Sequence, residues 1–199
     1  ITDDAGESLE IYYAQQRFRE AGWQPVIAPE AEFYLVSKNL DADFPLVPPP
    51  GRSGRAETAS EAFGLEALGE YEEIIEQIYD WCEKAELNID TMIHEMGAAQ
   101  LEVNFLHGDP LKLADQVFLF KRVVRAVAKQ HGVYATFMAN PMAGQPGSAM
   151  HLHQSVVDAE TGRNLFSNAN GRDSALFRSY IAGLVKFMPQ VSPLWAPNV

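Results

Sequence analysis

The sequence predicts an α+β fold in which a curved antiparallel sheet, part of a barrel-like cavity, is flanked by helices. Helix and strand patterns follow one another without the regular strand–helix–strand alternation of a doubly wound sheet. Three strand candidates each have one apolar face and one polar face, as expected for a sheet with a core on one side and a polar cavity on the other. At 199 residues and 47% hydrophobic, the chain can form one well-packed domain or part of a larger one.

Periodicity and end signals predict the individual elements. Helices are expected at 7–21, 70–86, 110–132 and 174–188, and strands at 24–36, 89–95, 100–107, 134–138 and 148–157. Gly22 marks the end of the first helix, and Asp109-Pro110 combines an N-cap with a proline at the first helical position. The last helix is expected to stop before Pro189, because proline interrupts the hydrogen bonds of a helix.

Residues 40–64 are rich in proline and glycine and are expected to form a long loop. Loops of this length inside a compact domain are often functional or mobile. Within the loop, residues 51–55 (GRSGR) have the composition of an anion-binding turn. A plain solvated loop is the alternative, and the sequence alone does not decide between the two.

Composition argues against several classes of protein. The net charge of −12, with 27 acidic and 15 basic residues, argues against binding to nucleic acid, which requires clustered Lys and Arg. No apolar run approaches the length of a membrane span, and no signal peptide opens the chain. The single cysteine, Cys82, lies on the apolar face of a predicted helix and is expected to be a core thiol. We therefore expect a cytoplasmic protein that contacts neither nucleic acid nor membrane.

The strand at 26–36 has the clearest division into two faces. Its odd positions are all apolar, whereas Glu30 and Glu32 project together from the other face. Two neighbouring negative charges among apolar residues are costly unless cations or a wet cavity relieve them. A cation site is therefore one interpretation of this face, and a solvated edge face is the other.

The same alternation recurs in two later strands. Glu102 lies on the polar face of one, and His151 and His153 share a face of the other. A His-x-His pair can bind metal, although such pairs are also common in structural or exposed positions. Glu95 ends a less regular strand, and periodicity does not decide which way it points. Glutamates with one or two histidines suit Mg²⁺ or Mn²⁺ better than structural Zn²⁺, and several carboxylates can hold two or more ions.

Four segments in the same order resemble the glutamine synthetase family. Residues 29–33 (PEAEF) resemble its P-E-x-E-F strand, and 94–102 (HEMGAAQLE) resemble its H-E…Q-x-E segment. Residues 147–153 (GSAMHLH) are similar to its G-S-x-M-H-x-H run, and 196–199 (APNV) to the start of its A-P-N-x-N stretch. The resemblance implies a partial catalytic domain of the type I-like form, without the amino-terminal domain and the later part of the catalytic domain.

The resemblance also implies a reaction. ATP would phosphorylate the γ-carboxylate of glutamate, and ammonia or a polyamine would attack the resulting γ-glutamyl phosphate to form an amide. This is the chemistry of nitrogen metabolism and glutamine biosynthesis. The full-length protein would be a homo-oligomer whose active sites are shared between subunits, and the 199-residue chain alone would be inactive.

Site residues are carried over only where the motifs match. The resemblance implies that Glu32, Glu95 and Glu102 bind one divalent ion, and that Glu30 and His151 bind a second. Gly147 would lie against glutamate. The residues implied to contact the nucleotide are Asp90, His153 and Ser155. No side chain is assigned a catalytic role beyond binding.

The chain departs from the family pattern in two places. Pro146 stands where ammonia-using members typically have Asn, and Asn140 where a lysine is common. Pro146, with residues 51–55 and 80–83 (DWCE), resembles the glutamate–putrescine ligase branch, so ammonia and a polyamine both remain candidate acceptors. A catalytically silent scaffold of the same family is an alternative. A cupin is another, but the next glutamate, Glu160, follows His153 by seven positions, which is poor spacing.

Overall fold

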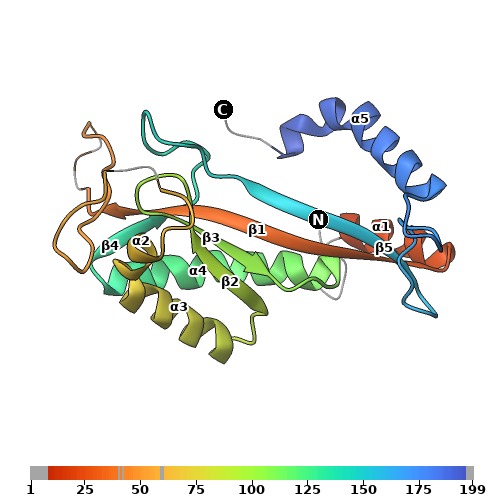
Figure 1. Ribbon diagram of the computed structural model, residues 1–199, viewed down its shortest axis with the longest axis horizontal. Coiled ribbons are helices and arrows are strands. Elements are labelled where there is room, and N and C mark those ends of the chain that lie inside the picture. Colours follow the sequence, from red (N-terminus) through yellow and green to blue (C-terminus); the bar gives the residue numbers. More distant parts are fainter. Residues whose placement is uncertain (1–8, 40, 42, 59–60, 196–199) are drawn as a thin grey trace. The chain divides into compact units, whose positions relative to one another are not determined.

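The computed structural model describes residues 9–39, 41, 43–58 and 61–195 (Figure 1). The chain divides into two compact units. One unit consists of Ala28–Gly108 and Lys112–Leu152, and the other of Ile1–Ile27, Asp109–Leu111 and His153–Val199. The start of the first predicted helix (7–8) and the motif at 196–199 lie outside the described residues.

Five strands form one sheet in which the order is β2-β3-β1-β4, and β5 also pairs with β1. The strands are β1 (Trp23–Ser37), β2 (Ile89–His94), β3 (Gln100–Phe105), β4 (Val133–Thr136) and β5 (Met150–Asp158). β1 is antiparallel to both β3 and β4, and β2 is antiparallel to β3. The predicted α+β fold with an antiparallel sheet is confirmed, and the sheet is open rather than closed into a barrel.

One face of this sheet is the core of the larger unit. Phe33 of β1 and Leu101 of β3 have no exposed surface, as their odd positions predict. Helix α4 (Pro110–Gln130) packs on this face through Phe120, whose ring lies 6.2 Å from that of Phe33 and 5.4 Å from that of Phe105. The apolar face predicted from alternation is therefore the face that the helix covers.

Helix α3 (Glu72–Lys84) lies beside α4 (Figure 1). Gln77 of α3 joins the two, because its amide donates a 2.7 Å hydrogen bond to Gln130 of α4. The buried face of α3 consists of Ile74, Ile75, Ile78 and Cys82. Burial raises the pKa of Cys82 to about 12, which confirms the predicted core thiol and argues against a nucleophile.

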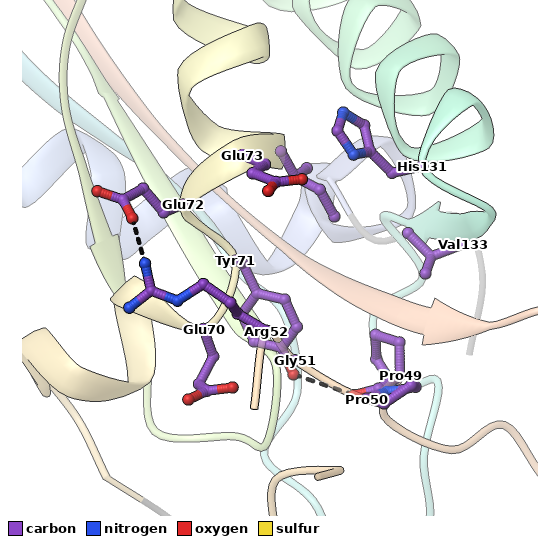
Figure 2. Close-up of a pocket in the computed structure, with 11 residues that line it drawn as sticks. Pro49, Pro50, Gly51, Arg52, Glu70, Tyr71, Glu72, Glu73, His131 and Val133 are labelled. Carbon is purple, nitrogen blue, oxygen red and sulfur yellow. Dashed lines mark hydrogen bonds and ion pairs between the residues drawn. The ribbon is translucent and has the colours of Figure 1, made fainter. Parts of the chain in front are cut away.

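The described part of the 40–64 loop contains no helix or strand, and a short helix, α2 (Leu65–Gly69), follows it. The GRSGR turn contacts two carboxylates of the chain itself, those of Glu70 and Glu72. The backbone N–H of Ser53 donates a 2.8 Å hydrogen bond to Glu70, and Arg52 forms a 2.7 Å ion pair with Glu72 (Figure 2). The hydrogen bonds from Ser53 lower the pKa of Glu70, and the charge of Arg52 lowers it further. A cavity of about 300 Å³ beside the turn is lined by residues that include Arg52, Glu70 and Glu72.

The smaller unit contains α1 (Leu9–Glu20) and α5 (Ala175–Trp195). The prediction that the last helix stops before Pro189 was wrong. Proline lacks an N–H and leaves the carbonyl one turn earlier without its helical partner. That carbonyl belongs to Val185, a residue with 73% exposure, so water can replace the missing donor. No helix among the described residues is long and apolar enough to cross a membrane.

The Phe120 ring should be a main stabilising element of the larger unit. Phe120→Ala should lower the free energy of unfolding by about 3–5 kcal/mol, because it empties a fully buried site. Phe118→Ala on the same helix is the matched control, since Phe118 is 61% exposed and its loss should change stability by less than about 0.5 kcal/mol. Denaturant unfolding measures both, and equal effects would contradict the assigned core.

Candidate metal centre

The face of the sheet opposite α4 carries the polar side chains of β1 and β3. The register pairs Glu30 with Asn104, Glu32 with Glu102, and Tyr34 with Gln100. Because side chains alternate across a strand, all three pairs project to the same side. The structure therefore places Glu32 and Glu102, two residues of like charge, directly opposite each other.

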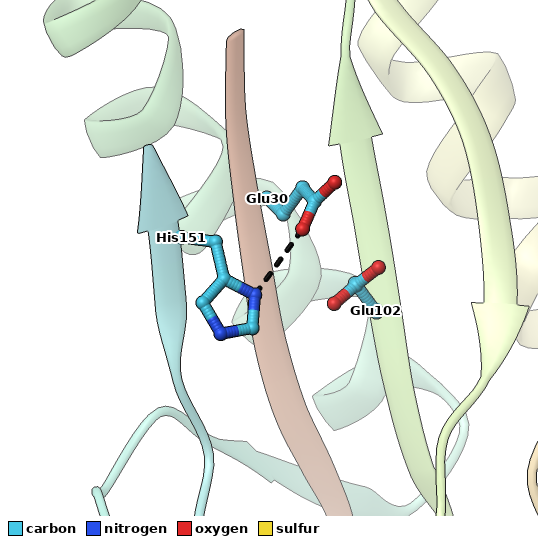
Figure 3. Close-up of side chains that lie close together, drawn as sticks. All are labelled: Glu30, Glu102 and His151. Carbon is cyan, nitrogen blue, oxygen red and sulfur yellow. Dashed lines mark hydrogen bonds and ion pairs between the residues drawn. The ribbon is translucent and has the colours of Figure 1, made fainter. Parts of the chain in front are cut away.

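Glu30, Glu102 and His151 come together on three adjacent strands (Figure 3). Their potential ligand atoms all lie within 4.8 Å of one another. Glu30 Oε2 lies 3.2 Å from His151 Nδ1, while Glu102 is nearly buried, with 6% exposure. Among the described residues, this is the group whose spacing suits a metal ion.

Glu102 interacts with every other glutamate of the predicted set. Burial raises its pKa, the charge of Glu30 raises it further, and the charges of Glu95 and Glu32 add to the shift. A hydrogen bond of 3.2 Å from Asn104 Nδ2 opposes the shift in part. The four carboxylates thus lie close enough to repel one another, and a cation among them would relieve that repulsion.

Glu32 is held by two donors. Its Oε2 accepts hydrogen bonds from Gln100 Nε2 at 2.9 Å and from the backbone N–H of Ala149 at 3.0 Å. Gln100 also donates to the Gly147 carbonyl at 3.1 Å, so one buried amide links β1, β3 and the loop before β5. Glu32 is therefore held in place beside Glu30, Glu102 and His151, but it is not one of the three residues whose ligand atoms lie within 4.8 Å of one another.

Glu95 follows β2 at the start of the turn 95–99, where its Oε2 accepts a 3.1 Å hydrogen bond from the N–H of Met96. Periodicity left its direction open, and its charge contributes to the pKa of Tyr34 on β1. Burial raises the pKa of Tyr34 to about 12, and the charges of Glu32 and Glu95 contribute to the shift. The charge of Glu95 therefore lies within electrostatic range of the polar face that carries Tyr34 and Glu102.

The predicted substrate and nucleotide residues are more scattered. Gly147 lies where a Cβ atom would be 2.8 Å from the Ala139 carbonyl, so the backbone approach requires glycine. Asp90 is exposed at the irregularity between β2 and β3, and its charge reaches the Tyr79 hydroxyl of α3. His153 and Ser155 belong to the smaller unit. Ser155 Oγ is buried without a hydrogen-bond partner in the part of the chain that the structure describes.

Sequence reasoning did not assign a role to Tyr34, Gln100 or Glu57. Tyr34 and Gln100 lie on the same polar face as Glu32 and Glu102, so strand alternation carried a signal for both. Glu57 lies in the long loop, where no periodicity exists. Its contact with His94, at 2.9 Å between Oε2 and Nε2, is visible only in three dimensions.

Removing one charge should stabilise the metal-free centre. Glu102 keeps its proton to higher pH in the folded than in the unfolded chain, so the stability that this group contributes is present at acid pH and is lost as pH rises through its raised pKa. Glu102→Gln cannot ionise, so it avoids this loss of stability at higher pH. In EDTA, the variant should therefore melt at a higher temperature than the wild type at neutral pH.

The two proteins should differ less in melting temperature at pH 4, where Glu102 is mostly protonated in both states. Glu66→Gln, which removes an exposed charge from α2, should not reproduce the effect. A wild type that is the more stable protein at neutral pH in EDTA would contradict carboxylate repulsion.

Comparisons with known proteins relate the chain to one family. Residues 12–199 match the family model described as glutamine synthetase, catalytic domain. The chain is 36% identical over 187 residues to gamma-glutamylputrescine synthetase PuuA of Escherichia coli (strain K12), covering 92% of this chain and 39% of that protein. It is 35% identical over 185 residues to glutamine synthetase of Pyrococcus horikoshii, again covering 92% and 39%.

Solved structures share the fold. A novel glutamine synthase homolog matches 99% of this chain and 44% of its own, with a TM-score of 0.79 and 24% identity. A GmaS/ADP complex matches 95% of this chain and 42% of its own, with a TM-score of 0.78 and 24% identity. The chain spans 39% of the length of the two curated relatives. Because the family model matches residues 12–199, the chain belongs to the glutamine synthetase catalytic-domain family.

Proposed function

We propose that this chain supplies the divalent-metal centre of an ATP-dependent ligase that joins the side-chain carboxylate of glutamate to an amine. The observation that carries the proposal is the convergence of Glu30, Glu102 and His151, with ligand atoms within 4.8 Å of one another. Membership of the glutamine synthetase catalytic-domain family supports it. Because the chain spans 39% of its curated relatives, the activity is proposed for the full-length protein.

The donor set fits Mg²⁺ or Mn²⁺. Carboxylate oxygens with a single imidazole are ligands that these ions accept, whereas structural zinc sites favour cysteine and histidine. Glu102 is buried, and three other glutamates repel its charge. A cation bound to its carboxylate would offset the free-energy cost of burying that charge. A divalent ion bound there would neutralise negative charge on a phosphoryl group.

We assign Glu32, Glu95 and Glu102 to one ion and Glu30 and His151 to a second. Within the first set, we assign Glu102 the position next to the second ion, because it is close to Glu30 and His151 and also interacts with Glu32 and Glu95. Gly147 would contact glutamate, and Asp90, His153 and Ser155 would contact ATP. In this proposal, the metal-, glutamate- and ATP-binding residues orient the reactants for two steps. The first is phosphorylation of the γ-carboxylate, and the second is attack by the amine on γ-glutamyl phosphate.

We favour a polyamine over ammonia as the acceptor. Pro146 and the 51–55 turn support this choice, because both resemble the glutamate–putrescine ligase branch. The relative named gamma-glutamylputrescine synthetase, at 36% identity, is compatible with it, although glutamine synthetases match almost as well. We also propose that the full-length protein is a homo-oligomer with shared active sites.

Loss of the imidazole should weaken metal binding. His151→Ala in the full-length protein should raise the dissociation constant for Mn²⁺ about tenfold or more, because it removes one ligand of the cluster. His107→Ala, which removes an exposed histidine after β3, should leave the affinity unchanged. Isothermal titration measures both. A wild-type protein that binds neither Mn²⁺ nor ATP would instead favour a catalytically silent scaffold.

The acceptor should be identified by direct comparison. Full-length protein supplied with ATP, Mg²⁺ and glutamate should form γ-glutamylputrescine with a kcat/KM for putrescine at least tenfold above that for ammonia. Mass spectrometry of the amide product and release of phosphate provide the measurement. Glutamine formation with indifference to putrescine would overturn the polyamine assignment while leaving the ligase in place.

A further inference from the structure

We propose that Glu57 is a positioning residue for the metal centre, whose carboxylate fastens the turn 95–99 between β2 and β3. This turn carries Glu95 at its start and leads into Gln100, the residue that holds Glu32. The inference rests on the proposed function, and it adds a residue from the long loop that no motif pointed to.

The carboxylate of Glu57 contacts the last residue of the turn, Ala99, and the residue just before the turn, His94. Its Oε2 accepts a 2.7 Å hydrogen bond from the N–H of Ala99 and lies 2.9 Å from Nε2 of His94. The other ring nitrogen of His94 lies 3.0 Å from the backbone carbonyl of Glu61. His94 is 1% exposed, so the loop encloses this histidine from both sides. The contacts of Glu57 join residues 37 and 42 positions apart in the sequence.

The turn needs such support because its backbone is unusual. Ala99 has a φ of 59°, in the left-handed region that residues other than glycine rarely adopt, and it has no exposed surface. Its buried N–H requires an acceptor, which Glu57 supplies. At Gly97 a Cβ atom would overlap the Tyr34 hydroxyl, so the turn is also packed tightly against β1.

A continuous set of hydrogen bonds leads from this turn to the carboxylates. The N–H of Glu95 donates to the Gln100 carbonyl at 2.8 Å, which closes the turn. The N–H of Gly97 donates to Gln100 Oε1 at 2.9 Å and so orients the amide, whose Nε2 then donates to Glu32 at 2.9 Å. Displacement of Ala99 would therefore move both Glu95 and the donor that holds Glu32.

A purely structural role makes a different prediction from a positioning role. If Glu57 only stabilises the fold, its removal lowers stability and leaves the metal affinity of the folded protein unchanged. If it positions the turn, folded protein binds metal more weakly, because partners behind the ligands typically change metal affinity by about 10–100-fold. Metal affinity and local hydrogen exchange together separate the two roles.

The experiment uses Glu57→Ala and Glu57→Gln in the full-length protein. Isothermal titration gives the dissociation constant for Mn²⁺, and mass spectrometry gives hydrogen exchange in a peptide containing Ala99 in the metal-free protein. We expect Glu57→Ala to weaken Mn²⁺ binding about 10–100-fold and to speed exchange. Glu57→Gln keeps an acceptor oxygen and should restore much of both properties.

Two variants serve as controls. Glu61→Gln removes an exposed charge from the same loop but keeps the backbone carbonyl that contacts His94, so both readouts should match the wild type. Tyr71→Phe removes a buried 3.3 Å hydrogen bond to the Pro49 carbonyl, so it should lower the free energy of unfolding without changing Mn²⁺ affinity.

If Glu57→Ala does not fold, Glu57→Asp replaces it, because a side chain shorter by one methylene lengthens the contacts with the Ala99 N–H and the His94 ring.

A folded variant whose Mn²⁺ affinity and Ala99 exchange both lie within twofold of the wild type would overturn the inference. A wild-type protein that binds no Mn²⁺ would instead overturn the proposed function. In that case, hydrogen exchange at Ala99 still decides whether Glu57 fastens the turn.

Discussion

The carboxylate face depends on the pairing of β1 with β3, which sets Glu32 directly opposite Glu102. Like charges in that position oppose strand pairing by roughly 0.2–1 kcal/mol. The opposite face of the same two strands buries Phe33 and Leu101 completely, at about 1.5–3 kcal/mol for each such side chain. A slip of one residue would expose these side chains, so burial of the apolar face fixes the register and forces the carboxylates together.

Neighbouring donors hold the carboxylates without neutralising them. Asn104 donates to Glu102, while Gln100 and the N–H of Ala149 donate to Glu32. Neutral donors fix the direction in which a carboxylate points but leave its charge in place. The pKa of Glu102 stays raised, so the hydrogen bond from Asn104 does not offset its burial and the charges around it. The remaining imbalance is of the kind that a divalent cation corrects.

Strand alternation was enough to predict the two faces of β1 and β3, because side-chain direction depends only on local backbone geometry. It could not predict that Glu102 forms a group with Glu30 and His151, since register between distant strands is not a local property. Glu57 was missed for the same reason, as it acts from an irregular loop. Helix α5 passes Pro189 because exposure lowers the cost of a missing hydrogen bond, and exposure cannot be read from a proline alone.

The departure at Pro146 is compatible with an intact centre. The Tyr34 hydroxyl donates a 2.7 Å hydrogen bond to the backbone carbonyl of Pro146, and this bond ties the loop before β5 to β1. Any residue at this position offers the same carbonyl, so exchanging Asn for Pro leaves the bond unchanged. The exchange removes an amide side chain and restricts the backbone. Its effect therefore falls on the side-chain groups that the loop presents rather than on the carboxylates that the loop helps to hold.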